Sequence, residues 1–186
     1  MNETLKTIAE RYSCRDFADT PLTAAQIQAI TQAALAAPSA LNRQPWHVIV
    51  IEDKTFIDEM DADSMGILAA AEDQTGYERI MSRGGKLFYN APCMILVASD
   101  GSDYAAMDCG ILSQNVALAA HSLGLGNVIC GMARIPLAGP RGGEFKKRMQ
   151  FPAGYEFGIA VLLGTAQSKK APHERDMDKI TRINAD

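Results

Sequence analysis

Arg11, Ser13 and Arg15 stand at every second position near the amino terminus. In an extended segment, alternate side chains point to the same side, so two guanidinium groups and a hydroxyl can face one ligand. Guanidinium groups form charge-assisted hydrogen bonds with phosphate oxygens, and the hydroxyl adds a neutral one. The pattern therefore indicates a phosphate site, and a solvated charged turn is the alternative.

A second polar segment, Pro38–Trp46, reads Pro-Ser-Ala-Leu-Asn-Arg-Gln-Pro-Trp. Pro38 and Pro45 fix φ near its two ends, and the residues between them offer several side-chain donors and acceptors from a constrained backbone. This rigidity predicts that the loop holds a ligand. For Asn42 and Gln44, the alternative is hydrogen bonding within the loop itself, and Trp46 is expected in the core.

The sequence gives little support for metal sites, disulfides, a cysteine nucleophile or a dinucleotide-binding fingerprint. The four cysteines lie far apart without C-x-x-C spacing, which argues against zinc, iron–sulfur and disulfide frameworks and indicates reduced, mostly buried thiols. Cys130 has no histidine or acid nearby in sequence, so packing is a better interpretation than nucleophilic catalysis. The glycines of Gly124-Leu125-Gly126 follow a helical stretch, whereas the glycines of a dinucleotide-binding fingerprint follow a strand and open a helix. The sequence therefore does not predict a Rossmann dinucleotide site here.

Hydrophobic periodicity places both polar segments at the ends of elements. Residues 1–12 read as a short amphipathic helix, so Arg11 and Arg15 stand at its exit. Thr23 and Gln26 match a capping box, and the helix that follows runs until Pro38 stops it. Residues 47–52 read as a buried strand. The loop is thus a helix-to-strand junction.

The rest of the chain alternates helical and strand-like patterns. Residues 54–83 predict loose helices, broken at Gly66, Gly76 and Gly84-Gly85, which form a mobile cover. The other expected elements are strands at 93–99 and 157–163, helices at 103–123 and 144–149, a short strand or loop at 128–132, and an extended tail from residue 165.

Length and composition suit one soluble domain. The chain has 186 residues, 47% of them hydrophobic and 22% charged, which predicts a single domain over 1–186 with a tail at 165–186. The net charge of −4 gives no reason to expect a nucleic-acid partner. The amino terminus lacks the pattern of a secretory signal and no long apolar run occurs, so we expect a cytoplasmic protein without a membrane partner.

The Arg11-x-Ser13-x-Arg15 start and the Pro38–Trp46 loop, at this separation, together resemble the FMN-dependent nitroreductase family. The resemblance implies the nitroreductase fold, an α/β (α+β) architecture with a mostly antiparallel central sheet flanked by helices. It also implies an intertwined homodimer in which C-terminal extensions cross to the partner and the flavin site lies at the subunit interface.

The same resemblance implies a set of FMN-binding residues. Arg11 and Ser13 would take the phosphate, and Arg15 the phosphate or the pyrimidine edge of the flavin. The full implied set is Arg11, Tyr12, Ser13, Arg15, Pro38, Ser39, Ala40, Asn42, Gln44, Lys86, Ile129, Cys130, Gly131, His173 and Arg175. Of these, Pro38, Ser39, Ala40 and Asn42 would line the flavin ring of the other subunit.

Several positions in this set depart from the family pattern or have an alternative interpretation that does not involve the cofactor. Ala40 stands where serine is common, and His173 replaces a lysine of the tail motif. Lys86 would lie near the flavin N1 and C2 carbonyl, and its alternative is an exposed lysine at a helix end. For Ile129 to Gly131, the resemblance implies a backbone N–H near flavin N5.

The implied function is an FMN-dependent oxidoreductase. NADH or NADPH would reduce the flavin at N5 and leave, and a nitro compound, quinone or similar acceptor would then take the electrons in a ping-pong sequence. No protein side chain is expected to act as catalyst, and no metal is expected. The alternatives are a flavin carrier or redox-sensing module without NAD(P)H turnover, and a divergent family activity such as dehalogenation or flavin fragmentation.

Overall fold

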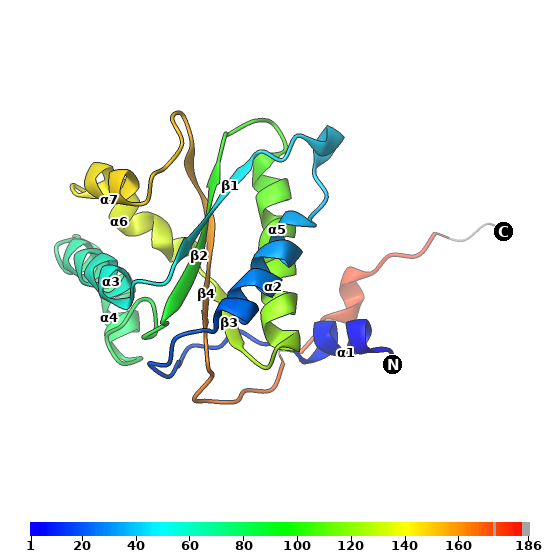
Figure 1. Cartoon of the computed structure of the whole chain (residues 1–186). Coiled ribbons are helices and arrows are strands. Elements are labelled where there is room, and N and C mark those ends of the chain that lie inside the picture. Colours follow the sequence, from blue (N-terminus) through cyan, green and yellow to red (C-terminus); the bar gives the residue numbers. More distant parts are fainter. Residues whose placement is uncertain (173, 184–186) are drawn as a thin grey trace.

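The centre of the molecule is a four-stranded antiparallel sheet in the order β1-β2-β4-β3 (Figure 1). This computed structural model describes residues 1–172 and 174–183. The strands are β1 (Trp46–Ile51), β2 (Cys93–Ser99), β3 (Gly126–Ile129) and β4 (Glu156–Gly164). The strands predicted at 47–52, 93–99 and 157–163 are therefore confirmed, as is the mixed, mostly antiparallel fold class.

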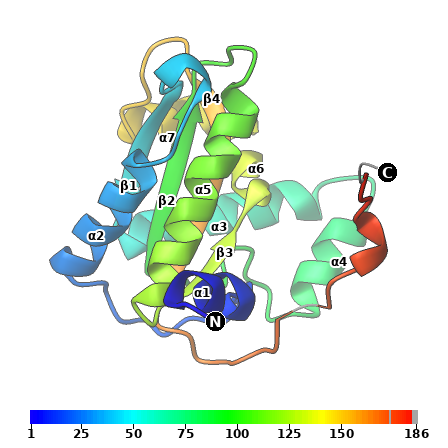
Figure 2. The same ribbon diagram turned by 90° about the vertical axis from the view of Figure 1, so that its right-hand side faces the viewer.

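Helices cover both faces of the sheet (Figures 1 and 2). On one face lie α2 (Ala24–Leu35) and α5 (Ala105–Ser122); on the other lie α3 (Lys54–Ala69), α6 (Arg134–Ala138) and α7 (Gly142–Arg148). Residues of β2 alternate between the two resulting cores, because successive side chains of a strand point to opposite faces. All of β2 is therefore buried, which explains its uninterrupted apolar sequence.

Side-chain caps fix where several helices begin. Asn2 accepts a hydrogen bond from the Leu5 N–H at the start of α1 (Glu3–Glu10). At α2, Thr23 and Gln26 form both bonds of the predicted capping box. Such caps satisfy amide groups that have no partner inside the helix, each typically stabilising by about 1 kcal/mol.

The region 54–83 differs from its prediction. Instead of loose helices broken at Gly66, α3 runs unbroken through that glycine, and its Phe56, Ile57 and Met60 side chains are buried. The prediction underrated this apolar face, whose burial outweighs the cost of about 1 kcal/mol for glycine inside a helix. A shorter helix, α4 (Thr75–Met81), follows. The short helix α6 was not predicted.

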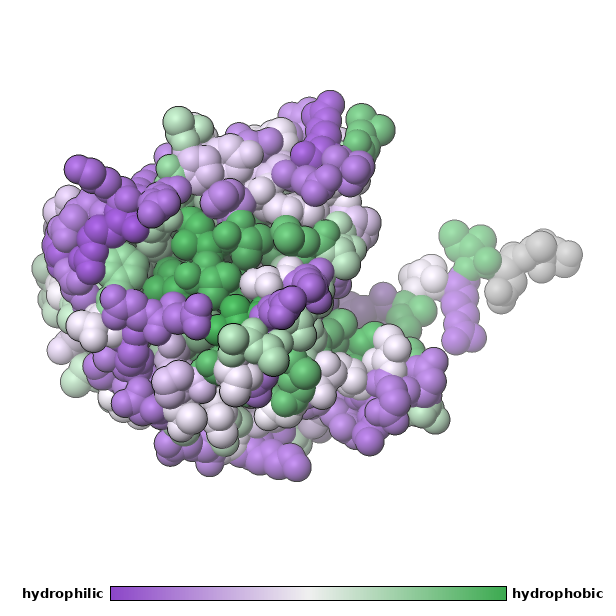
Figure 3. All heavy atoms as spheres, in the orientation of Figure 1, coloured by the Kyte–Doolittle hydropathy of each residue, from purple (hydrophilic) through white to green (hydrophobic). Residues whose placement is uncertain are grey.

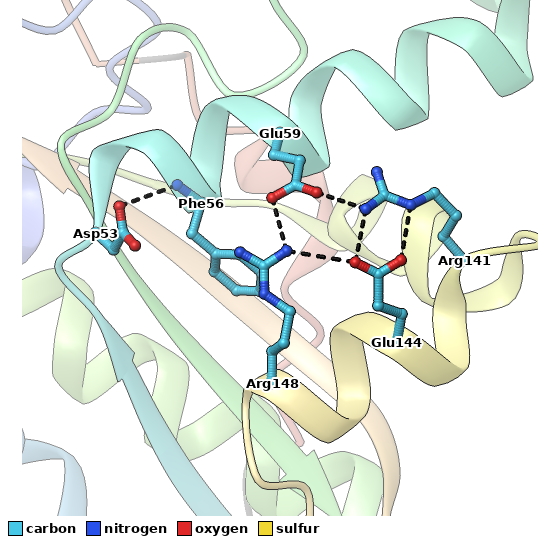
Figure 4. Close-up of polar contacts among 6 residues, drawn as sticks. All are labelled: Asp53, Phe56, Glu59, Arg141, Glu144 and Arg148. Atoms are coloured by element: carbon cyan, nitrogen blue, oxygen red, sulfur yellow. Dashed lines mark hydrogen bonds and ion pairs between the residues drawn. The ribbon is translucent and has the colours of Figure 1, made fainter.

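Ion pairs join α3 to α7 (Figure 4). The Glu59 carboxylate lies 2.5 Å from Arg141 Nη2 and 2.7 Å from Arg148 Nη1. Glu144 also pairs with both arginines. The Arg141 and Arg148 guanidinium groups stack on Phe145 and Phe56, 4.7 and 4.2 Å from the ring centroids. These two arginines are therefore engaged within the chain.

Strand β1 forms one edge of the sheet and, among the described residues, pairs only with β2. The apolar surface in the middle of Figure 3 lies over this part of the sheet.

The tail leaves the body of the molecule (Figure 1) and exposes Met177, Ile180 and Ile183. It contains the helical turn η3 (Met177–Lys179). In the described ranges, no helix has the length and apolar character needed to cross a membrane.

Candidate functional site

The segment after α1 is extended, as predicted, and runs beside β3. The Cys14 N–H donates to the Asn127 carbonyl at 2.8 Å, and the Cys14 side chain is fully buried. Arg11 and Ser13 are half-buried and Arg15 is exposed. A Cβ at Gly126 would come within 2.9 Å of Cys14 Sγ, so glycine is what lets the two segments approach.

Arg15 lies at the meeting point of two adjoining clefts of about 620 and 240 Å³, which share Arg15, Arg83 and Tyr89. The larger cleft is lined by Arg15, Asp16, Arg83, Gly84, Lys86, Tyr89, Asn90, Ser168 and Lys170. The smaller is lined by Arg15, Arg79, Ile80, Arg83, Tyr89, Val128, Ile129, Cys130, Gly131 and Met132. We call the two together the arginine cleft. It brings together five of the predicted site residues: Arg15, Lys86, Ile129, Cys130 and Gly131.

A buried carboxylate supports the turn that carries Lys86. Asp61, on α3, is 2% exposed and accepts a hydrogen bond from the Phe88 N–H at 2.6 Å. The next two residues, Tyr89 and Asn90, have φ values of 53° and 59°, which non-glycine residues rarely adopt. Burial raises the pKa of Asp61, although the hydrogen bond from Phe88 and the charge of Lys86 act against that rise.

Asp61 was missed from the sequence, although one signal pointed to it. It stands between Met60 and Ser64, which are also buried, so it belongs to the inward face of α3. An acid on such a face needs a partner. Lys86 itself lines the cleft and lies five residues after the end of α4, with its Nζ 4.0 Å from Asp58 Oδ1. It is therefore not a lysine at a helix end.

The segment Cys130-Gly131 forms another wall of the cleft. The Cys130 N–H donates to the Ala160 carbonyl at 2.7 Å, and burial raises the pKa of its thiol. Both observations agree with a packing role for this side chain. At Gly131, a Cβ would meet nothing closer than Ile159 Cδ1 at 4.0 Å. Packing within the chain therefore does not require glycine here, whereas a ligand close to the backbone would.

The loop from Pro38 to Gln44 lies at the opposite end of the sheet from α1 (Figures 1 and 2). Its Ala40 N–H points to the buried Asp108 carboxylate, 3.2 Å away on α5. Ser39 Oγ accepts from the Gln44 N–H at 2.9 Å, and Gln44 Nε2 donates to Asn42 Oδ1 at 3.3 Å. The internal bonding considered as the alternative for Asn42 and Gln44 is therefore present.

The backbone of this loop is also constrained. Leu41, Asn42 and Gln44 have φ values of 53°, 54° and 47°, and Leu41 is 87% exposed. These φ values lie in the left-handed region, which non-glycine residues rarely adopt. Trp46 is 7% exposed and packs in the core, as predicted.

The tail is tied to the amino-terminal helix. Arg175 donates to the Ala9 carbonyl at 2.9 Å, and the Tyr12 hydroxyl donates to the Ser168 carbonyl at 3.0 Å. Tyr12 lines a separate groove of about 700 Å³, which meets the arginine cleft at Lys170. His173 lies outside the described residues.

Comparisons with known proteins identify the family to which this fold belongs. The model of the Nitroreductase family matches residues 8–165, so the chain belongs to the nitroreductase family. A solved structure of a nitroreductase with bound FMN from Desulfitobacterium hafniense is 54% identical with a TM-score of 0.96, covering 99% of this chain and 100% of that one.

Two curated relatives are more distant. An FMN reductase [NAD(P)H] from Bacillus subtilis is 29% identical over 211 aligned positions, which cover 100% of this chain and 77% of that protein. An NADPH-flavin oxidoreductase from Vibrio harveyi is 32% identical over 141 residues, covering 72% of this chain and 55% of that protein. The chain thus matches little more than half the length of the Vibrio relative.

Proposed function

We propose that this protein binds FMN and uses it to pass electrons from NADH or NADPH to an electron-poor acceptor such as a nitro compound or a quinone. The arginine cleft carries the proposal, because it joins Arg15, Lys86 and the open backbone at Gly131 in one place. The similarity to a nitroreductase with bound FMN supports the choice of cofactor.

The donor set of the chain suits FMN. The cofactor has a phosphate at one end and a ring with polar edges at the other, and guanidinium and ammonium groups bind both kinds of acceptor. Arg11 and Ser13 would hold the phosphate, and Arg175 and His173 would add to it from the tail. Arg15 would take the phosphate or the pyrimidine edge.

The remaining groups would position the ring. Lys86 would place a positive charge beside N1 and the C2 carbonyl, which favours the reduced, negatively charged ring. The backbone from Ile129 to Gly131 would lie near N5. Bound FMN would supply two-electron transfer through N5, which is why the chain needs no nucleophile or acid–base pair of its own. Donor and acceptor would use the same cleft in turn.

We further propose a homodimer in which the loop of one subunit completes the site of the other. Within one chain, the loop and α1 lie at opposite ends of the sheet (Figures 1 and 2). Ser39, Ala40 and Asn42 can therefore act on a flavin beside Arg15 only if a second copy supplies them. The unpaired edge of β1, seen over residues 1–172 and 174–183, and the exposed apolar residues of the tail support exchange between subunits.

Titration of the purified protein with FMN, followed by anaerobic addition of NADH or NADPH, tests this function. We expect a yellow complex that either nucleotide bleaches and that a quinone or nitro compound restores. A protein that remains colourless with added FMN contradicts the proposal. Flavin that binds but is not bleached by either nucleotide identifies a carrier or sensor, and halide release or loss of the flavin ring identifies a divergent activity.

A further inference from the structure

Arg79, in the last turn of α4, and Arg83, in the turn that follows it, add two positive charges to the arginine cleft. Arg79 and Arg83 both line it, together with Arg15, Lys86 and Lys170, which makes five cationic side chains. Of the described residues that line the two clefts, Asp16 alone is acidic. The whole chain carries a net charge of −4, so this concentration of positive charge is local.

Among the described residues, the two guanidinium groups have no carboxylate partner in the cleft. Arg79 belongs to the last turn of α4 and Arg83 to the turn after it, and both line the smaller cleft. In the part of the chain that the structure describes, neither forms an ion pair, nor does Arg15. Arg141 and Arg148, in contrast, each meet two carboxylates.

The cofactor alone does not account for all five charges. A phosphate monoester carries about −1.5 to −2 near neutrality, and Arg11, Ser13, Arg15 and the tail are already proposed to bind it. The part of the cleft beside Arg79 and Arg83 is otherwise lined by apolar groups, including Ile80, Val128 and Met132. An apolar wall with a cationic rim suits a flat molecule that carries a negative group.

We propose that Arg79 and Arg83 recognise a carboxylate or phosphate group on the substrate, so that the enzyme prefers anionic substrates over neutral ones of the same shape. This inference rests on the proposed function and adds a substrate class to it. The negative group has two possible sources, the 2′-phosphate of NADPH and a carboxylate on the electron acceptor. Both would use the same guanidinium chemistry.

Equilibrium binding tests the inference without requiring turnover. Calorimetry on the FMN-saturated protein compares 4-nitrobenzoate with 4-nitrobenzamide, and NADP⁺ with NAD⁺, for the wild type, R79Q, R83Q and the double variant. We expect the wild type to prefer the anionic member of at least one pair, and the double variant to lose about tenfold of that preference, the size of one charge-assisted hydrogen bond. High salt should reduce the preference of the wild type.

Lys147 provides a matched control, since it is exposed on α7 and lines neither cleft. K147Q should leave both preferences unchanged. Loss confined to the nitrobenzoate pair assigns the arginines to the acceptor, and loss confined to the nucleotide pair assigns them to the 2′-phosphate.

Three results would overturn the inference. The first is equal affinity of the wild type for the two members of both pairs, and the second is a double variant that keeps the full preference of the wild type. The third is a loss of FMN affinity in the double variant as large as its loss of preference, which would assign both arginines to the cofactor. Steady-state kcat/KM ratios for the same pairs provide a second readout. If the wild type binds FMN but neither nucleotide reduces it, the proposed function fails while the binding ratios still decide this inference.

Discussion

The α3–α7 contact and the arginine cleft both contain arginines, and their surroundings differ. Arg141 and Arg148 are surrounded by Glu59, Glu144 and aromatic rings, so their charges are neutralised within the chain (Figure 4). Arg15, Arg79 and Arg83 line the cleft, and among the described residues none of the three forms an ion pair. The difference indicates that arginine in the first region supports the fold and in the second is available to a ligand.

The largest effect expected from this contrast is that of R15A on cofactor affinity. Losing charge-assisted hydrogen bonds of about 1.5–3 kcal/mol should weaken FMN binding about ten- to hundredfold. Quenching of flavin fluorescence measures the dissociation constant. R141A is the matched control: it should lower Tm and leave FMN affinity unchanged. Equal FMN affinity of R15A and wild type would remove the distinction between the two regions.

A second effect concerns the support beneath the cleft. D61A leaves the Phe88 N–H buried without its acceptor, which should reduce the free energy of unfolding by about 1–3 kcal/mol and weaken FMN binding through the Lys86 turn. D61N keeps a hydrogen-bond acceptor for the Phe88 N–H, so it should retain most of the stability and most of the FMN affinity. Urea unfolding and FMN titration of the two variants check this. Unchanged stability of D61A would show that Asp61 does not anchor the turn.

The raised pKa of Asp61 gives this pair of variants a pH dependence. A carboxyl whose pKa is higher in the folded state binds protons more tightly there, so its ionisation costs stability as pH rises from about 4 through the folded pKa. D61N lacks this loss. The difference in free energy of unfolding, D61N minus wild type, should therefore grow over that range. A constant difference across the range would contradict the assignment.

A smaller effect is expected at the loop. S39A/N42A removes two side chains proposed to reach the partner's flavin, each hydrogen bond being worth about 0.5–1.5 kcal/mol. FMN affinity should fall severalfold while the fold is kept, because the loop is also held by Asp108. Circular dichroism checks that the fold is kept, and FMN titration measures the loss of affinity. Unchanged affinity would mean that the loop only joins a helix to a strand.

The smallest effect is expected at the ion pairs, because Glu59 and its partners are partly exposed to solvent. E59Q should lower Tm slightly at low salt and leave FMN affinity unchanged. The pKa of Glu59 is lowered by hydrogen bonds from Arg141 and Arg148, so its contribution should be lost as pH falls through that pKa. A loss of FMN affinity in E59Q would link the two regions.

Sequence patterns predicted the elements with local causes. The capping box at Thr23 and the uninterrupted apolar run of β2 report structure directly, because their signals lie within a few residues. The sequence patterns failed where tertiary packing determines the structure. Helix α3 continues through Gly66 because its apolar face packs in the core. For the site, the motif positions predicted Arg15 and Gly131. They missed Arg79 and Arg83, which tertiary folding brings to the cleft, and Asp61, which accepts a hydrogen bond from the Phe88 N–H.

We infer that the arginine cleft of one subunit and the loop of its partner form one FMN site. Mixing the R15A and S39A/N42A proteins, and measuring FMN bound per dimer after subunit exchange, decides whether they do. We expect mixed dimers to regain one tight FMN site per two chains, because one of the two sites then combines an intact Arg15 with an intact loop. No recovery of tight binding in verified mixed dimers would contradict it.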